Sequence, residues 1–328
     1  MDQPWVVTLP EQDFVDAVGS PPDGVRVRLW DLSAPAERPE EISVVVPPYM
    51  EVGDWRPVLA ALPNLRLVQT LTAGYESMLP LLPEGVALAN AVGVHDSSTS
   101  ELAVGLALAV LRGFPDFVRD AEHGRWAPQR RRALADRRVL VVGFGGVGRA
   151  VAGRMTAFEA QVTAVASRAR APRPEEAALG VQQVHGVGAL ADLLPQHDVV
   201  VLTVPLNDAT RAMVDADFLA AMPDGAVLVN VARGGVVDTD ALVAELNSGR
   251  LLAGLDVTEP EPLPEGHPLW SAPGVLISPH VGGATSAFTP RAGRMLREQL
   301  DRLSTGRPLR GIVVRGQFGD EFAGEARS

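Results

Sequence analysis

Three side chains whose chemistry suits an anionic substrate each follow an apolar run of this sequence. Arg233 follows "VLVNVA", Glu261 follows "LLAGLDV" in a proline-rich loop, and His280 follows "GVLIS". An arginine fork matches a carboxylate, and a histidine, whose unperturbed pKa is about 6.5, exchanges protons near neutrality. A carboxylate on the second ring nitrogen would fix the histidine tautomer and favour its protonated form. These residues predict a site that binds an anion and transfers a proton.

Two of these residues also have a plainer explanation. Arg233 could be a surface arginine after a strand, and His280 could be a hydrogen-bonded core histidine. Because all three residues come from strand ends of one predicted sheet, we favour the functional interpretation. Of the remaining histidines, His267 could line the same cleft. The others show no metal-ligand spacing and are predicted to be structural or exposed, and no metal site is predicted: His95, His123, His185 and His197.

A glycine pattern in "VLVVGFGGVGRAV" indicates a dinucleotide site. Gly143, Gly145 and Gly148 form GxGxxG directly after a predicted strand and at the start of a predicted helix. The first glycine permits a tight turn, the second lets the backbone approach a pyrophosphate, and the third allows close packing of helix and strand. The chain has 32 glycines, so a structural turn is the alternative. The strand–turn–helix context favours dinucleotide binding.

The tip of the next strand bears on the choice of cofactor. Dinucleotide sites that select NAD usually carry Asp or Glu there, whereas arginine suits the 2′-phosphate of NADP. Here the tip is Ser167, Arg168, Ala169 and Arg170, with no carboxylate. The pattern favours NADP over NAD, and the alternative is a pair of solvated arginines.

The elements that must position these residues alternate between short apolar strands and helical segments, which predicts an α/β fold. Residues 25–30, 42–46, 65–70 and 86–90 are the strands expected in a first layer. Six more uniformly apolar strands follow, as in a doubly wound parallel sheet: 138–145, 161–168, 198–205, 226–233, 251–257 and 274–280. A helix is expected over 284–304, after which "GIVV" returns to the first layer as a strand or a loop.

Composition excludes several classes of function. The formal charge of −11 disfavours binding to nucleic acid or to an anionic membrane, and Arg130 to Arg132 are interpreted as a solvated loop. The chain contains neither cysteine nor lysine, which excludes disulfides, thiolate nucleophiles and Schiff-base lysines. The opening "MDQPWVVTLP" does not resemble a signal peptide, so a cytoplasmic location is expected. The apolar run Leu102 to Leu111 is too short to span a bilayer.

Four motifs together resemble the D-isomer-specific 2-hydroxyacid dehydrogenase family, and in type most closely its glyoxylate and hydroxypyruvate reductases: "GFGGVG", "VNVARGGVVD", "GLDVTEPEPLPEGHPLW" and "SPHVGGAT". The resemblance implies a Rossmann dinucleotide-binding domain over 98–287. It also implies a flavodoxin-like α/β substrate domain, discontinuous in sequence, over 1–97 and 288–328. The family is commonly dimeric, so a homodimer is expected.

The resemblance places Arg233, Glu261 and His280 at the positions of the family's catalytic residues. It places the backbone amides of Ala73 and Gly74, in "LTAGYES", against the substrate carboxylate. Tyr75 stands where many relatives carry a small aliphatic residue, so we expect it to narrow the substrate pocket. The cofactor-binding candidates, with Asp256 near the nicotinamide carboxamide, are Gly143, Gly145, Gly146, Val147, Gly148, Ser167, Arg168, Val204, Pro205, Thr210, Val231, Ala232, Asp256, Gly282 and Gly283.

The implied activity is hydride transfer between NADP, or less favourably NAD, and a small 2-oxo or D-2-hydroxy acid. Closure of the two lobes would exclude water, so hinge motion is expected near Ser97 to Glu101 and Ala284 to Ala287. Two alternatives remain open. One is a phosphite-type anion dehydrogenase, and the other is a dinucleotide-sensing binding protein similar to the corepressors related to this family.

Overall fold

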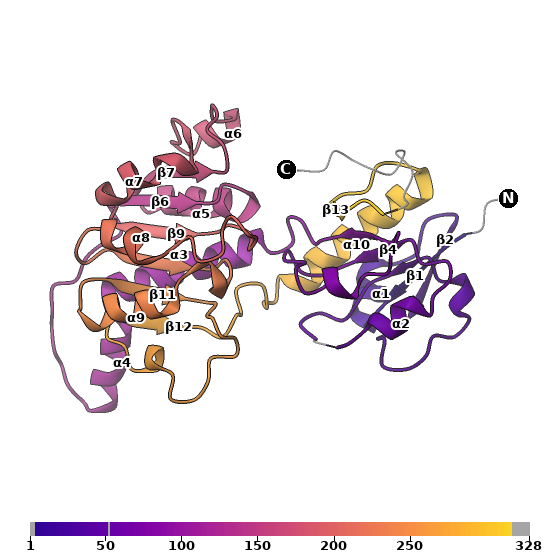
Figure 1. Cartoon of the computed structure of the whole chain (residues 1–328), viewed down its shortest axis with the longest axis horizontal. Coiled ribbons are helices and arrows are strands. Elements are labelled where there is room, and N and C mark those ends of the chain that lie inside the picture. Colours follow the sequence, from indigo (N-terminus) through magenta and orange to yellow (C-terminus); the bar gives the residue numbers. More distant parts are fainter. Residues whose placement is uncertain (1–3, 52, 317–328) are drawn as a thin grey trace. The chain divides into compact units, whose positions relative to one another are not determined.

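A computed structural model describes residues 4–51 and 53–316. The chain divides into two compact units, one of Met1–His95 with Ser286–Ser328 (unit 1) and one of Asp96–Thr285 (unit 2). The expected domains change over at 97/98 and 287/288, and their outermost residues, 1–3 and 317–328, lie outside the described residues. Each unit has its own sheet (Figure 1).

Unit 1 contains a six-stranded sheet in the order β13-β5-β4-β3-β1-β2. Adjacent strands are parallel except β13, which pairs antiparallel with β5. The order 2-1-3-4-5 of the parallel strands is that of flavodoxin-like sheets, as expected. The elements are β1 (Trp5–Leu9), α1 (Gln12–Val18), β2 (Val25–Leu29), β3 (Val44–Val45), α2 (Arg56–Ala60), β4 (Leu67–Gln69), β5 (Ala87–Ala89), α10 (Phe288–Thr305) and β13 (Ile312–Val314).

The strand predictions for unit 1 are confirmed with one omission. The sequence "GIVV" does return to this sheet, as β13. Strand β1 was not predicted, although it lies between β2 and β3 in the sheet. Its signal is a run of mostly apolar residues bounded by Pro4 and Pro10. Helix α10 begins at Phe288, four residues after the expected start.

Unit 2 contains a seven-stranded parallel sheet in the order β12-β11-β10-β9-β6-β7-β8, which confirms the doubly wound prediction. Only β8 was missed. The strands are β6 (Arg138–Val142), β7 (Gln161–Ala166), β8 (Val184–Gly186), β9 (Val199–Leu202), β10 (Val227–Asn230), β11 (Leu252–Leu255) and β12 (Val275–Ile277). The helices are α3 (Asp96–Arg112), α4 (Phe114–Glu122), α5 (Gly146–Ala157), α6 (Pro174–Ala177), α7 (Leu190–Leu193), α8 (Ala216–Ala221) and α9 (Thr239–Asn247).

Helices cover both faces of the unit 2 sheet, which explains why its strands are apolar throughout. Residues of α3 and α5 pack in one buried cluster with one face of β6, β9 and β10. Residues of α8 and α9 pack in a second cluster with the opposite face. The parallel strands bring their carboxyl ends to one edge of the sheet, where the candidate residues follow β7, β10, β11 and β12.

The predicted hinge segment Ser97 to Glu101 is the first part of α3, because the helix already begins at Asp96. The chain passes between the units at 95/96 and 285/286, next to both predicted hinge segments. In the described ranges, no helix is both long and apolar enough to cross a membrane.

Candidate active site

His280 and Glu261 form a direct pair at the carboxyl edge of the unit 2 sheet. The Nδ1 atom of His280 lies 2.5 Å from Oε1 of Glu261, although the two residues are 19 positions apart in sequence. Their side chains are 42% and 41% exposed, so the pair can be reached from solvent. Because Nδ1 faces the carboxylate, Nε2 is the ring nitrogen left to exchange a proton with a ligand.

The loop that carries His280 is held by Asp256, which lies at the end of β11. The carboxylate of Asp256 is buried and accepts hydrogen bonds from the backbone N–H groups of Val281 and Gly282, both at 2.9 Å, and from the hydroxyl of Ser278 at 2.7 Å. Its carbonyl oxygen accepts from the N–H of His280 at 2.8 Å. His280 has a φ of 53°, a left-handed conformation that is uncommon without such support. Sequence reasoning missed this supporting role.

Arg233 lies at the turn that follows β10. Asn230, the last residue of β10, fixes this turn by donating from Nδ2 to the carbonyl of Arg233 at 3.0 Å and accepting from the N–H of Ala232 at 3.0 Å. A Cβ atom on Gly234 would lie 1.9 Å from the carbonyl oxygen of Thr258. Glycine is therefore required where this turn meets the loop after β11, which places the turn beside the segment that leads to Glu261.

The glycine loop after β6 has the packing expected of a dinucleotide site. A Cβ atom on Gly143 or Gly148 would collide with backbone, of Thr203 at 2.7 Å and of Gly143 at 2.0 Å. At Gly145, the N-cap of α5, nothing lies within 4 Å of that position. The crowded glycines close the turn, and the exposed Gly145 leaves room for the close approach that a pyrophosphate needs. A Cβ atom on Gly146, the first residue of α5, would lie 2.1 Å from the carboxylate of Asp96.

The two arginines after β7, Arg168 and Arg170, differ in their surroundings. Ser167 and Arg168 are exposed. The guanidinium of Arg170 instead binds both oxygens of Glu176, at 2.6 and 2.8 Å, and is not free for a phosphate. Hydrogen bonds from Arg170 lower the pKa of Glu176 to about 2. The expectation that either arginine could bind a 2′-phosphate is therefore narrowed to Arg168, and Glu176 was not foreseen.

The remaining cofactor candidates of unit 2 lie at the same sheet edge. Thr210 donates to the carbonyl of Pro205 at 2.6 Å and accepts from the N–H of Asn207 at 2.9 Å, so its hydroxyl closes the loop after β9. Val231 and Ala232 are buried at the end of β10. Gly146 and Val147 form the first turn of α5, Val204 is partly buried after β9, and Gly282 and Gly283 follow His280.

The predicted substrate loop belongs to unit 1. The carbonyl of Ala73 accepts from Nδ2 of Asn90 at 2.7 Å, and that of Gly74 accepts from the hydroxyl of Thr72 at 2.6 Å. The carbonyls are thus bonded within the unit. Tyr75 packs, partly buried, against a core cluster of unit 1.

The other histidines agree with the prediction that they are structural or exposed. His95 and His197 are buried and hydrogen-bonded, His185 is partly buried in β8, and His123 is exposed at the end of α4. His267 accepts from the N–H of Leu269 at 3.2 Å, which orders the turn after the Glu261 loop.

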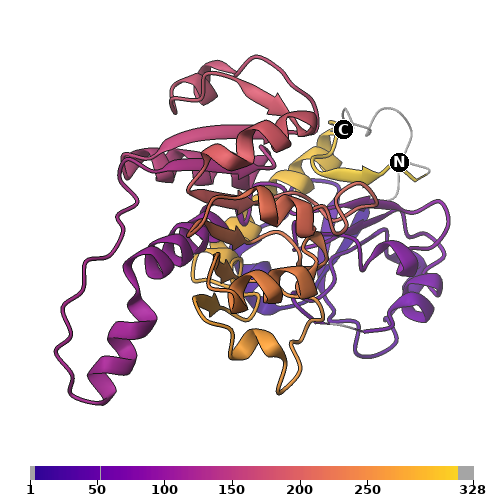
Figure 2. The same ribbon diagram turned by 60° about the vertical axis from the view of Figure 1, so that its left-hand side comes forward.

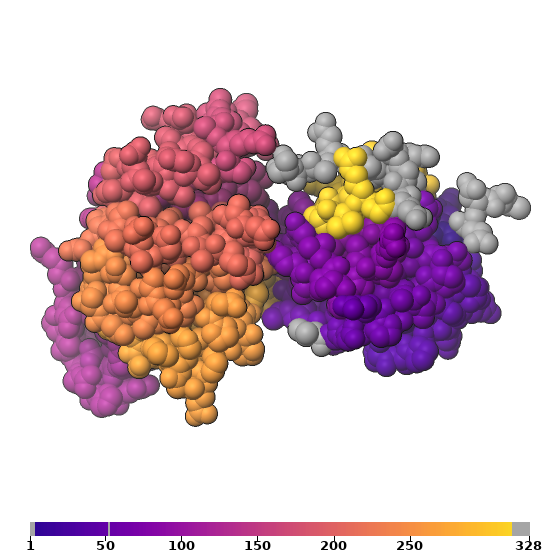
Figure 3. Space-filling view, viewed as in Figure 1, coloured from indigo at the N-terminus to yellow at the C-terminus, as the bar shows by residue number. Residues whose placement is uncertain are grey.

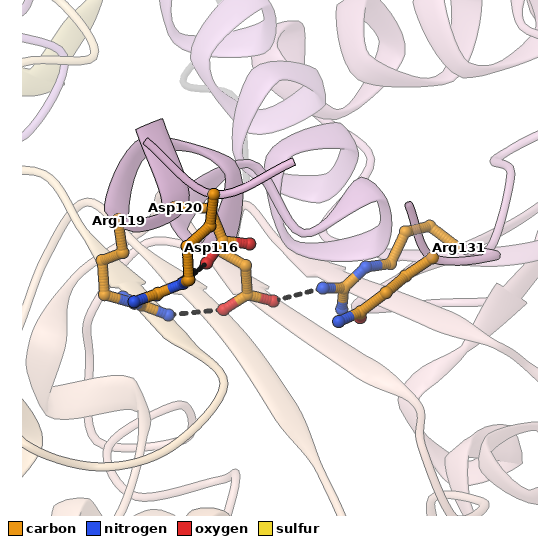
Figure 4. Close-up of a pocket in the computed structure, with 6 residues that line it drawn as sticks. Asp116, Arg119, Asp120 and Arg131 are labelled. Atoms are coloured by element: carbon orange, nitrogen blue, oxygen red, sulfur yellow. Dashed lines mark hydrogen bonds and ion pairs between the residues drawn. The ribbon is translucent and has the colours of Figure 1, made fainter. Parts of the chain in front are cut away.

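A separate pocket of about 290 Å³ lies beside α4 (Figure 4). Its charges pair with one another: Asp116 accepts from Arg119 at 2.5 Å and from Arg131 at 2.6 Å. Arg132 donates to the carbonyl of Gly225. Residues 130–132 do form a loop, but the interpretation as solvated is wrong for Arg131 and Arg132, whose partly buried side chains bind Asp116 of α4 and the carbonyl of Gly225.

Comparison with known proteins shows which family this chain is similar to. The family model "D-isomer specific 2-hydroxyacid dehydrogenase, NAD binding domain" matches residues 104–282. The human protein named glyoxylate reductase/hydroxypyruvate reductase is 34% identical over 240 residues, which cover 71% of this chain and 72% of the human one.

Solved structures of similar fold match nearly the whole chain. A D-isomer-specific 2-hydroxyacid dehydrogenase from Xanthobacter autotrophicus, in complex with NADPH and MES, is 31% identical with a TM-score of 0.79 and covers 96% of this chain and 99% of its own. The NADPH-dependent glyoxylate/hydroxypyruvate reductase from Sinorhizobium meliloti, in complex with NADP and sulfate, is 25% identical with a TM-score of 0.79 and covers 97% and 100%.

Proposed function

The chain belongs to the D-isomer-specific 2-hydroxyacid dehydrogenase family, and we propose that it reduces a small 2-oxo acid of the glyoxylate or hydroxypyruvate type with NADPH. It is an NAD(P)-dependent oxidoreductase. The observation that carries the proposal is the His280–Glu261 pair, an exposed acid–base group at the carboxyl edge of a dinucleotide-binding sheet.

The residues of this chain divide the reaction between binding and proton transfer. When bound, the nicotinamide supplies a hydride to the carbonyl carbon of the substrate. Arg233 binds the substrate carboxylate and polarises the carbonyl oxygen. His280 donates a proton from Nε2 to that oxygen, which gives the 2-hydroxy acid, and afterwards regains a proton from solvent. Glu261 fixes the ring and stabilises its protonated form.

We further propose that the cofactor is held at the edge where β6 and β7 end. The open N-terminus of α5 at Gly145 would take the pyrophosphate, and Ser167 with Arg168 would take the 2′-phosphate. This arrangement supports a preference for NADPH over NADH. The substrate-loop amides of Ala73 and Gly74, and hinge motion at the two chain crossings, remain parts of the proposal.

The two alternatives receive less support. The relative and the neighbour described above are named as reductases of 2-oxo acids, and neither name refers to phosphite or to a corepressor. A catalytic test separates the proposed activity from both alternatives. Oxidation of NADPH and of NADH is followed by absorbance with glyoxylate, hydroxypyruvate, pyruvate and bulkier 2-oxo acids. Turnover on a small 2-oxo acid is expected, and its absence on the whole panel despite tight NADPH binding would contradict the proposal.

We also propose a homodimer in which α4 and the segment after it contact a second copy. Phe117, Val118 and Trp126 are 42%, 61% and 95% exposed, a concentration of apolar surface that soluble monomers rarely leave uncovered. Figure 2 shows α4 and the following segment projecting from unit 2, and Figure 3 shows α4 at the margin of the unit. Light scattering is expected to give a dimeric mass that falls to a monomeric one in Val118→Asp, and a monomeric wild type would contradict the proposal.

A further inference from the structure

Glu176 is a buried carboxylate with no part in the proton-transfer site. Its side chain has no exposed surface, yet it lies in α6, a helix of four residues near the tip of β7. Oε2 accepts from Nη1 of Arg170 at 2.6 Å and from the backbone N–H of Arg173 at 2.9 Å, and Oε1 accepts from Nη2 of Arg170 at 2.8 Å. A buried ion pair is often no more stabilising than apolar residues of similar volume, so its geometry needs a different explanation.

The pair fixes the loop over residues 167–173 from two sides. Arg170 exchanges backbone hydrogen bonds with Val184 of β8, at 2.9 and 3.2 Å, while its side chain is held by Glu176. A Cβ atom on Gly186 would lie 3.1 Å from the backbone nitrogen of Ala169, so the loop passes directly against β8. Before Arg170 this loop consists of Ser167 to Ala169, and all three residues are exposed.

The same contacts decide which arginine can meet an anion. Both Nη atoms of Arg170 face Glu176, and Arg149 of α5 lies 3.9 Å from the same carboxylate. The charge of Glu176 therefore offsets those of Arg170 and Arg149, whereas Arg168 is exposed. A guanidinium on a fixed backbone loses less conformational entropy when it binds a phosphate than one on a mobile loop.

We infer that Glu176 is a positioning residue for cofactor discrimination: by holding Arg170 it sets the loop conformation in which Ser167 and Arg168 bind the 2′-phosphate of NADPH. This inference rests on the proposed preference for NADPH. Glu176 itself touches neither the cofactor nor the substrate in this scheme.

The test compares Glu176→Gln with the wild-type full-length enzyme. Dissociation constants are measured by fluorescence titration for NADPH, for NADH, and for adenosine 2′,5′-bisphosphate against AMP, which isolates the 2′-phosphate without any turnover. We expect NADPH and the bisphosphate to bind about tenfold more weakly, which is the loss of one charge-assisted contact, while NADH and AMP change less than about twofold. Glu176→Asp, which keeps the charge, should recover part of the loss.

Glu245→Gln is the matched control, because Glu245 binds the guanidinium of Arg250 at 2.6 Å elsewhere in unit 2. It should lower the melting temperature without changing either affinity ratio. If Glu176→Gln does not fold, the double variant Arg170→Leu/Glu176→Leu replaces the pair with apolar side chains and should show the same selective loss.

The outcomes separate this inference from the proposed function. A wild type that prefers NADPH, together with a variant that weakens NADPH and NADH equally, overturns the inference alone. Tighter NADPH binding by the variant also overturns it, because Arg170 would then be a phosphate ligand restrained by Glu176. A wild type without any preference for NADPH overturns the inference together with the proposed preference for NADPH on which it rests.

Discussion

Two histidines lie at opposite edges of the unit 2 sheet. His197 precedes β9 at the amino edge and is 4% exposed, whereas His280 follows β12 at the carboxyl edge and its side chain is 42% exposed. Both nitrogens of His197 are used internally, Nδ1 by the carbonyl of Leu193 at 2.6 Å and Nε2 by the hydroxyl of Thr163 at 2.9 Å. His280 uses Nδ1 for Glu261. A histidine with an accessible second nitrogen can act on a ligand, and one with two internal partners can only support the fold.

The comparison also shows how the sheet separates the two roles. Parallel strands direct their carboxyl ends to one edge, where loops can leave side chains open to a ligand. The buried carboxylate of Asp256 fixes the loop around His280, so rigidity is supplied from below while the ring itself stays accessible. Nothing comparable is needed at His197, whose own hydrogen bonds fix it.

The largest expected effect on turnover comes from removing the imidazole of His280. His280→Ala removes the proton donor and should lower kcat about 10³-fold, with little change in the dissociation constant of NADPH. Steady-state kinetics with the best 2-oxo acid and a fluorescence titration of NADPH measure the two quantities. His123→Ala, at an exposed position on unit 2, is the control and should keep wild-type turnover. Retention of kcat within a few-fold in His280→Ala would show that another group donates the proton.

Glu261→Gln should give the next largest effect. The amide can still bond to His280 but cannot stabilise a positively charged ring, so we expect kcat to fall about 10²-fold. Glu261→Asp should be intermediate. The dissociation constant of NADPH and the amount of folded protein distinguish the proposed role from simple loss of structure, because loss of the carboxylate partner should lower kcat and leave both of these unchanged. A fall in kcat that only matches a loss of folded protein would refute the role.

Arg168→Ala tests a second role of the carboxyl edge, the binding of the cofactor at the end of β7. We expect NADPH to bind about tenfold more weakly and NADH to change less than about twofold, since only NADPH carries the 2′-phosphate. Arg173→Ala is the matched control, because Arg173 is exposed in the same loop and contributes its backbone N–H to Glu176. Equal losses in the two variants would indicate a general effect of positive charge rather than a specific contact.

The strands that are continuous apolar runs could be predicted from the sequence, and so could the functional residues that follow their carboxyl ends. The carboxyl ends of β10, β11 and β12 carried Arg233, Glu261 and His280, and a parallel sheet brings such ends to one edge whatever their separation in sequence. The pair of Glu261 and His280 could be anticipated for this reason. Strand β8 was missed although β12, which also has three residues, was predicted: its sequence Val-His-Gly is not an apolar run, and its pairing with β7 makes it a strand.

Side-chain contacts that depend on how loops and short helices pack against one another could not be predicted from the sequence. Arg170 and Arg168 are indistinguishable by residue type and spacing, and only the fold of α6 brings Glu176 onto one of them. The same applies to Asp256, for which the family resemblance suggested a cofactor contact. Its three hydrogen bonds to residues 278–282 depend on how the loops after β11 and β12 meet, which no periodicity records.

The smallest expected effect on activity comes from the other side of the comparison, at His197. Burial lowers the pKa of His197, and the hydrogen bond to Leu193 only partly opposes this. The unfolded state therefore binds more protons below a pH of about 6.5, and the contribution of the neutral ring to stability is complete above that pH and is lost as the pH falls. His197→Asn should lower the free energy of unfolding by about 1 kcal/mol at pH 8, since at least one hydrogen bond is lost. It should also make the free energy of unfolding depend less on pH below about 6.5. Urea denaturation at several pH values measures both, while kcat should stay within about twofold because no His197 atom reaches the carboxyl edge. A large loss of turnover in a folded His197→Asn would mean that the two edges of the sheet are coupled and that the division of roles drawn from these histidines is wrong.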